Sequence, residues 1–288
     1  MYYELVIVGA GLTGLKTAII THDLKINNVL IVDYEKRKGG FGSSLFEREE
    51  FQAEREILKE SLNLPYEFWP QSTVIGFFAG ENGENHQISI QTPTGTKEVE
   101  AKRVFFCTGS LEKPREAHQI AGSRPAGVMT PLMALGLIER NRLPGFKCLV
   151  VENGKISKAV ANILEEKGCI VQRVPAEHYT IKNIKGNSRL NEVEIQDSET
   201  GDLHNYSCDT LIFSEGRIPC TFYLKGTNIK RDPNHFIMID EYGRTNVSGV
   251  FAFGTCTNHA ETFYYSLNQT NNLLKEILVG EKIRRLFY

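Results

Sequence analysis

A glycine-rich turn between an apolar run and a helical segment constrains the fold of this 288-residue chain more than any other feature. The turn reads Gly-Ala-Gly-Leu-Thr-Gly over residues 9–14 and follows the run Leu-Val-Ile-Val at residues 5–8. A second run, Val-Leu-Ile-Val at residues 29–32, ends at Asp33. Runs that are apolar throughout are typical of strands buried on both faces of a parallel sheet. The order strand, turn, helix, strand therefore predicts a right-handed βαβ unit.

The three glycines of this turn have the spacing of a dinucleotide-binding turn. Gly9 allows the tight turn, Gly11 lets a pyrophosphate approach the backbone, and Gly14 lets the helix pack closely on the strand. The anion would lie on unpaired N–H groups at the positive end of the helix. Asp33 is placed to accept hydrogen bonds from ribose hydroxyls. The alternative is a glycine-rich turn that holds no ligand.

The order of elements in the first half of the chain recurs in the second half, which predicts an internal duplication. Surface helices are expected over residues 48–62 and 157–167, and hairpins over residues 87–101 and 191–206. The other expected strands are residues 104–107, 148–151, 169–171, 210–213 and 249–253, and a last helix is expected over residues 262–278. Residues 142–145 and 217–219 both contain proline and are the expected links between domains.

Composition excludes several classes of protein. Lys and Arg number 33 against 35 Asp and Glu, and this balance argues against nucleic-acid binding, which needs a basic excess. No apolar run approaches the roughly 18 residues that a membrane-spanning helix requires. The six cysteines contain no C-x-x-C pair, which excludes a zinc ribbon and a vicinal redox dithiol. The cysteines are expected to be buried and reduced, which indicates a reducing, cytoplasmic compartment.

Further motifs resemble those of one superfamily. Besides the first turn they are Lys-Gly-Gly at residues 38–40, Phe-Cys-Thr-Gly-Ser at 106–110, Gly-Arg-Ile-Pro at 216–219 and Gly-Val-Phe-Ala-Phe-Gly at 249–254. Together they resemble the pyridine nucleotide-disulfide oxidoreductases, flavoproteins with two dinucleotide-binding domains, in the compact form of thioredoxin reductase. Residues 124–129, Arg-Pro-Ala-Gly-Val-Met, resemble a segment found in subunits of sarcosine oxidase, opine oxidase, dye-linked proline dehydrogenase and hydrogen cyanide synthase.

The resemblance implies an α/β fold of two Rossmann-like, three-layer ββα domains, the second inserted in the first. Residues 1–111 and 231–288 would bind FAD, and residues 112–230 would form a degenerate NAD(P)-binding-like domain. Asp33 would hold the ribose, the backbone near Val74 the adenine, and Thr255 the flavin end. No catalytic residue and no metal site is assigned. The positions implied to bind the cofactor are Gly9, Ala10, Gly11, Leu12, Thr13, Gly14, Asp33, Tyr34, Gly40, Val74, Thr108, Gly109, Gly254 and Thr255.

Three departures from the superfamily pattern bear on function. The missing C-x-x-C excludes disulfide reduction by the route of thioredoxin reductase. The second glycine turn, residues 152–157, has Glu152 and Ser157 where glycines are expected, and a carboxylate there repels a pyrophosphate. Arg173 is placed either to favour a 2′-phosphate or to be a solvated strand end. Thr255 stands where the family has an Asp that contacts the ribityl chain.

These observations predict an FAD-dependent oxidoreductase subunit of a multi-subunit amine or amino-acid dehydrogenase or oxidase. The subunit is expected to lack a disulfide redox centre and NAD(P)H binding. The expected partner is a second flavoprotein subunit that oxidises the substrate, or another copy of the chain. One alternative is a non-catalytic subunit that binds ATP or NAD, and another is a free-standing NADPH-dependent flavin reductase. Cys256 and His259 either face an isoalloxazine or are ordinary residues at the start of a helix.

Overall fold

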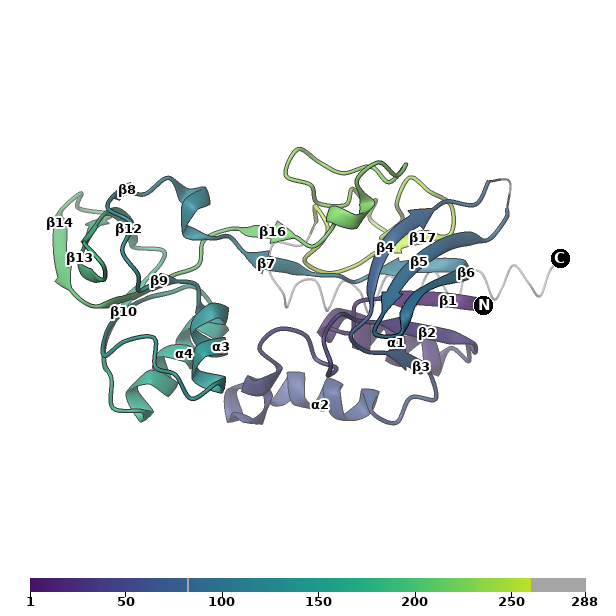
Figure 1. Cartoon of the computed structure of the whole chain (residues 1–288), viewed down its shortest axis with the longest axis horizontal. Coiled ribbons are helices and arrows are strands. Elements are labelled where there is room, and N and C mark those ends of the chain that lie inside the picture. The colour runs from purple at the N-terminus through teal and green to yellow at the C-terminus, as the bar shows by residue number, and fades with distance from the viewer. Residues whose placement is uncertain (82, 260–288) are drawn as a thin grey trace. The chain divides into compact units, whose positions relative to one another are not determined.

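The computed structural model describes residues 1–81 and 83–259, so the helix expected over residues 262–278 lies outside the described part. The chain divides into two compact units (Figure 1). Unit 1 consists of Met1–Leu111 and Ile218–Tyr288, and unit 2 consists of Glu112–Arg217. The two units confirm the expected α/β fold in which a second dinucleotide-binding plan interrupts the first.

Unit 1 is built on a seven-stranded sheet with the order β3-β2-β1-β6-β5-β4, and β17 pairs with β6. Its strands are β1 (Tyr2–Val8), β2 (Val29–Val32), β3 (Glu67–Trp69), β4 (Thr73–Phe78), β5 (His86–Thr92), β6 (Gly95–Phe106) and β17 (Val250–Ala252). β1 lies between β2 and β6 and is parallel to both. β4 and β5 add an antiparallel meander. The predicted βαβ unit is therefore confirmed, with helix α1 (Leu12–Asp23) as its crossover.

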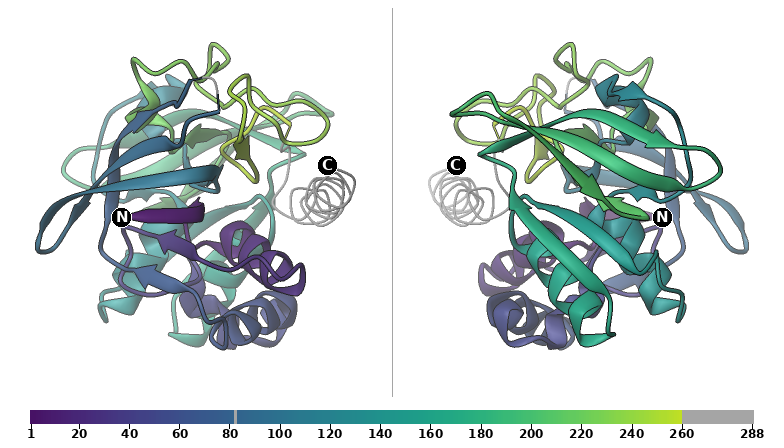
Figure 2. Two further views of the ribbon diagram at one scale, coloured as in Figure 1. Left: turned by 90° about the vertical axis from the view of Figure 1, so that its right-hand side faces the viewer. Right: turned by 90° about the vertical axis from the view of Figure 1, so that its left-hand side faces the viewer.

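The apolar runs of the sheet explain the layers of unit 1. Residues 5–8 of β1 and all of β2 are buried, because their alternate side chains face two different cores. One core includes Val6, Val8 and Phe106 and packs against the meander. The other includes Leu5, Ile7 and Leu15 and lies under α1. Helix α2 (Gln52–Ser61) follows two short 3-10 helices, η1 (Ser43–Glu47) and η2 (Glu49–Phe51), and packs on α1 (Figures 1 and 2).

Unit 2 repeats this plan with a four-stranded parallel sheet and a four-stranded second sheet. The first has the order β11-β10-β15-β9, with β11 (Ile170–Pro175), β10 (Lys147–Glu152), β15 (Thr210–Ile212) and β9 (Val128–Met129). The second has the order β14-β13-β12-β8, with β14 (Leu203–Ser207), β13 (Leu190–Asp197), β12 (Tyr179–Gly186) and β8 (Ala121–Gly122). A core that includes Leu149, Ile184 and Leu211 joins the two sheets. Helices α3 (Pro131–Glu139) and α4 (Lys155–Glu166) complete the unit.

The chain leaves unit 1 along β7 (Ser110–Glu112) and returns along β16 (Arg217–Pro219), and the two strands pair. The return falls at Ile218, earlier than the expected boundary at residue 231. The reason is that Leu224 and Ile229, with the short η4 helix (Phe222–Leu224), pack in the core of unit 1. Residues 142–145 are not a link between domains, because they join α3 to β10 inside unit 2. Proline and glycine mark a loop there, but they do not say which elements it joins.

Two strands expected from the sequence, residues 97–101 and 104–107, form the single long strand β6. No glycine or proline interrupts the run between them, so the polar pair Lys102-Arg103 continues the strand. Its first half pairs with β5 and its second half with β17. This strand carries the chain from the meander to the carboxyl edge of the parallel sheet. No helix among the described residues is long and apolar enough to cross a membrane.

Candidate nucleotide-binding site

The first glycine turn is held in a shape that side chains would prevent. Gly9 has a φ of +108°, and an added Cβ would overlap the carbonyl of Cys107. A Cβ on Gly14 would overlap the carbonyl oxygen of Gly9. Gly11 differs, because its φ is −70° and an added Cβ would meet nothing within 4 Å. Open space therefore lies over Gly11, while Gly9 and Gly14 are closed against the strand and helix.

Helix α1 begins at this turn without a side-chain cap. Gly11 is the N-cap, no side chain caps the helix, and no acidic residue lies in its first turn. The first N–H groups of a helix have no partner within the helix, and they carry its positive dipole end. Loop residues Gly39 and Gly40 lie directly on the turn, since Gly39 N donates to Ala10 O (2.8 Å). The arrangement is a cradle suited to a pyrophosphate.

Asp33 braces this turn from the end of β2. Its carboxylate is buried and accepts hydrogen bonds from the N–H of Ala10 (2.5 Å) and the N–H of Glu35 (2.7 Å). Burial raises the pKa of Asp33, and the two N–H donors oppose that shift. Each carboxylate oxygen keeps a second lone pair that could accept a hydrogen bond from a ribose hydroxyl. The ribose contact itself stays a prediction. The structure adds a bracing role that the sequence did not indicate.

Tyr34 and Val74 extend the region around Asp33. The Tyr34 ring is half exposed and packs on Phe41, with 5.8 Å between the ring centroids. The side chain of Val74 is buried in the core of unit 1, which leaves its backbone as the part able to meet a ligand. The segment just before Val74 contacts Asp33, because the N–H of Ser72 donates to the Asp33 carbonyl (2.8 Å). An adenine contact at this rim stays a prediction.

The structure brings the two later motifs to the first turn. A Cβ built on Gly254 would lie 2.7 Å from Thr13 Oγ1, and one built on Gly109 would lie 3.6 Å from Thr255 Oγ1. These residues come from the ends of β6 and β17, two neighbouring parallel strands, so their carboxyl ends meet at one edge. Leu12 and Thr13 are buried beside them at the start of α1.

Two buried hydroxyls at this edge, Thr108 Oγ1 and that of Tyr223, lie close to each other. Tyr223 lies in η4, and nothing in its sequence context indicated a place near the site. Open space over Gly11 and an uncapped helix fit the pyrophosphate of a dinucleotide.

Cys256 and His259 do not form a catalytic pair. Cys256 is fully buried, its thiol donates to Phe253 O (3.3 Å), and burial raises its pKa to about 11. A protonated, buried thiol behaves as a small core side chain. His259 is exposed. All six cysteines are free, and all but the half-buried Cys220 are buried, as expected.

The second turn, in unit 2, is filled by the protein's own groups. Arg173 forms an ion pair with Glu152 (3.2 Å) and another with Glu165 (2.5 Å), and it donates to Asn162 Oδ1 (2.8 Å). Hydrogen bonding to Glu165 raises the pKa of Arg173. Ser157 Oγ accepts the N–H of Asn153 (2.8 Å), a donor that a phosphate would otherwise use. Arg173 is therefore neither a solvated strand end nor free for a 2′-phosphate.

Helix α3, unlike α4, has a satisfied N-terminus. Thr130 accepts the N–H of Met133 (3.4 Å), and Glu112 Oε2 accepts the N–H of Leu132 (2.9 Å). Burial raises the pKa of Glu112. A carboxylate already at the positive end of α3 leaves no place there for a second anion.

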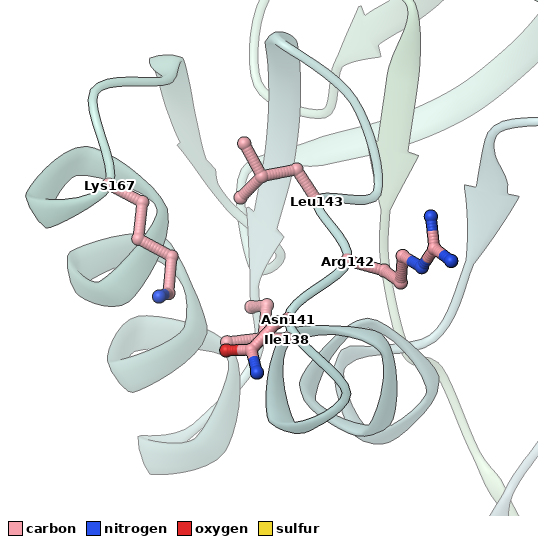
Figure 3. A pocket seen from close by; sticks show the side chains of 5 residues that line it. All are labelled: Ile138, Asn141, Arg142, Leu143 and Lys167. Atoms are coloured by element: carbon pink, nitrogen blue, oxygen red, sulfur yellow. The ribbon is translucent and has the colours of Figure 1, made fainter.

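Two cavities lie in unit 2. One of about 260 Å³ is lined by Ile138, Asn141, Arg142, Leu143 and Lys167, and Arg142 extends away from the other four side chains (Figure 3). Its lining precedes β10 and β11, so it lies at the amino edge of the parallel sheet, opposite the edge that binds dinucleotides. A second, of about 380 Å³, includes Lys113, His118, Thr180, Phe213 and Glu215 in its lining.

The fold repeats one dinucleotide-binding plan twice, and the first copy keeps its glycine turn. Residues 145–270 match the family model described as pyridine nucleotide-disulphide oxidoreductase. The chain is 34% identical over 169 residues to an NADH dehydrogenase of Bacillus subtilis, an overlap that covers 58% of this chain and 31% of the relative. It is 31% identical over 75 residues to a thioredoxin reductase of Treponema pallidum, covering 26% of this chain and 24% of that relative.

Two solved structures share the fold over nearly the whole chain. L-proline dehydrogenase from P. horikoshii has a TM-score of 0.71 at 21% identity, covering 98% of this chain and 56% of that chain. Thioredoxin reductase from T. acidophilum has a TM-score of 0.62 at 19% identity, covering 97% and 99%.

These matches confirm the predicted resemblance to the superfamily, and they support the predicted class of flavin-dependent oxidoreductase with FAD as cofactor. The chain spans about a third of the length of the NADH dehydrogenases that it matches.

Proposed function

We propose that this chain is the FAD-binding subunit of a multi-subunit amine or amino-acid dehydrogenase or oxidase. The observation that carries the proposal is the contrast between the two turns. The first turn keeps all three glycines, whereas the second turn has Glu152, which is paired with Arg173, and Ser157 in place of two of them. One dinucleotide therefore has a site, and a second one does not.

In the first site, each group has a separate task. The backbone from Gly9 to Gly14 holds the pyrophosphate, and Asp33 keeps that backbone in place through Ala10 N. The ends of β6 and β17 hold the flavin side through Thr108, Gly109 and Thr255. FAD supplies the redox chemistry when bound, and the protein supplies orientation and electrostatics.

The filled second turn supports a source of electrons other than NAD(P)H. A nicotinamide dinucleotide would have to displace the Glu152–Arg173 ion pair and the Ser157 hydrogen bond. Disulfide exchange is also unsupported, because the chain has no C-x-x-C. We assign the donor to the class of small amines or amino acids. L-proline dehydrogenase, an amino-acid dehydrogenase, shares the fold at 21% identity, which agrees with this donor class.

The partner is a second flavoprotein subunit, or another copy of this chain. We place the complex in the cytoplasm, since free, buried cysteines suit a reducing compartment.

The test is to purify the full chain, record its visible spectrum, release the bound molecule and weigh it. We expect the flavin bands, the mass of FAD, and no bleaching on addition of NADPH or NADH alone without oxygen. A colourless protein that fails to take up added FAD would refute the proposal. Rapid bleaching by NADPH would instead identify a free-standing flavin reductase.

A second candidate is a non-catalytic subunit that binds ATP or NAD at the same turn. The observation that favours it is Thr255, which leaves the flavin end without the carboxylate that would accept two ribityl hydrogen bonds. The same mass measurement separates the two, since ATP or NAD in place of FAD would establish this candidate.

A further inference from the structure

Arg115 is an unusual buried cation in unit 2. It lies in the short 3-10 helix η3 (Arg115–His118) and is only 7% exposed. Its Nη2 donates to the carbonyl of Ser123, and its Nε has no hydrogen-bond partner among the described residues. Charged side chains are almost never fully buried without a partner, because leaving water is costly. The local protein contacts thus leave part of this guanidinium unsatisfied.

The charges around Arg115 make the imbalance larger. Arg124 lies close enough for its positive charge to act on Arg115, and only Glu116 acts in the opposite direction. Glu116 is exposed and forms no ion pair with Arg115. Arg115 therefore binds the carbonyl of the residue that precedes Arg124, and neither arginine forms an ion pair with a described carboxylate.

Arg124 itself has no structural task that the described residues reveal. It begins the Arg-Pro-Ala-Gly-Val-Met segment, whose other members build the fold. Pro125 is buried, and Val128–Met129 forms β9. Gly127 lies so close to the carbonyl oxygen of Asp209 that a side chain there would overlap it. Arg124 is exposed and makes no hydrogen bond or ion pair with a described residue.

The loop that carries this pair is fixed in place. Ser123 N donates to Ile184 O (2.8 Å), and Ser123 Oγ accepts the N–H of Gly186 (2.9 Å), which ties the loop to β12. Arg115 also holds Ser123, since its Nη2 donates to the Ser123 carbonyl. The pair is therefore organised before any ligand arrives, which lowers the entropy that binding costs.

We propose that Arg115 and Arg124 bind a phosphate group, either free or carried by a nucleotide. A guanidinium presents two parallel N–H donors that match the oxygens of a phosphate. Phosphate suits the pair better than a carboxylate, because a charge of about −1.5 to −2 at pH 7 balances two cations. This site is separate from the filled turn at Glu152, and it does not depend on what occupies the first turn.

The experiment uses the full chain saturated with FAD, so that the first turn does not compete. Inorganic phosphate is titrated at constant ionic strength, and the midpoint of thermal unfolding and the heat of binding are measured. Variants Arg124→Gln and Arg115→Lys are compared with Arg140→Gln, a control whose exposed guanidinium contacts only Gly136 O on its own helix. Because Arg124 is exposed, its substitution should leave the fold intact.

We expect phosphate to stabilise the wild type and the control, and Arg124→Gln to weaken its binding at least tenfold. ADP bound more than tenfold tighter than phosphate would identify a nucleotide as the source, and equal binding would identify free phosphate. Equal binding by Arg124→Gln and wild type would overturn the proposal, as would an equal effect of acetate and phosphate on the wild type. If Arg115→Lys fails to fold, the Arg124→Gln comparison still decides.

Discussion

At the first turn, glycines only a few positions apart meet different physical demands. Gly14 packs against the carbonyl of Gly9, whereas Gly11 faces open space with an ordinary extended backbone. The spacing of glycines indicates a nucleotide turn, but only the contacts separate a glycine that shapes the turn from one that makes room for a ligand. The two roles predict different mutant behaviour.

Replacing Gly14 by Ala should destabilise the protein by about 1–3 kcal/mol or more, because its methyl group overlaps backbone atoms that cannot move aside. Gly11→Ala should change stability by less than about 1 kcal/mol. It should nonetheless weaken FAD binding by about tenfold or more, since its methyl group takes up space over the turn. Urea unfolding of the apoprotein and titration with FAD measure the two effects. Equal stability losses in both variants would contradict this division.

His86 couples stability to pH. Its Nδ1 accepts the N–H of Gly80 (3.1 Å), and burial lowers its pKa below the usual value. Folding therefore favours the neutral ring, and the stability it contributes is complete above about pH 6.5 and is lost as the pH falls below that value. Urea unfolding at pH 7.5 and 5.5 should show a smaller loss in His86→Gln than in wild type. The exposed His204→Gln serves as the control, and an unchanged loss in His86→Gln would count against the assignment.

At the scale of elements, the residues of the two turns distinguish the first site from the second, because neither α1 nor α4 has a side-chain cap. In the second turn, Ser157 folds back on the residues that precede α4. The broken glycine pattern predicted a weakened second site from the repulsion of Glu152 alone. The structure adds that Arg173 compensates the charge of the Glu152 carboxylate through an ion pair. A dinucleotide is therefore disfavoured at the second turn because the protein's own groups occupy it, more than because Glu152 repels a phosphate.

Ser157→Ala should lower the free energy of unfolding by about 1–2 kcal/mol, because it leaves the Asn153 N–H without its acceptor. Ser207→Ala, at an exposed position of β14, should change it by less than about 0.5 kcal/mol. Chemical denaturation followed by circular dichroism measures both. If the two variants are equally stable, Ser157 does not hold this turn.

The local sequence pattern predicted most of the helices and strands near the first turn. It failed for strands that form only because a neighbouring strand pairs with them. Residues 29–32 are a strand as expected, because four consecutive apolar residues have no alternative to burial on both faces. The strands β3, β4 and β12 were not anticipated, since their side chains mix exposed and buried positions. They form because a neighbouring strand offers hydrogen bonds, which a local pattern does not contain.

At the scale of the whole molecule, two copies of one plan have taken different roles. The copy in unit 1 keeps an open turn. The copy in unit 2 fills its own turn and carries Arg115, whose Nε has no hydrogen-bond partner in the part of the chain that the structure describes. FAD should therefore slow amide hydrogen exchange in unit 1, around Gly11 and Gly254, and leave residues 153–157 unchanged. Mass-spectrometric exchange on the full chain, with and without FAD, gives the answer. Similar protection of both turns would show that unit 2 also takes part in FAD binding.

The sequence alone determined the class of fold, the place of the first turn, the absence of a C-x-x-C dithiol and the loss of the second glycine pattern. These depend on neighbouring residues, whose spacing limits the backbone directly. Only the tertiary structure decided which residues surround the site: Gly254 on Thr13, Thr255 beside Gly109, and Tyr223 facing Thr108. The burial of Arg115 and the pairing of Arg173 were decided there too. Burial and charge pairing depend on segments brought together by folding, so no local pattern contains them.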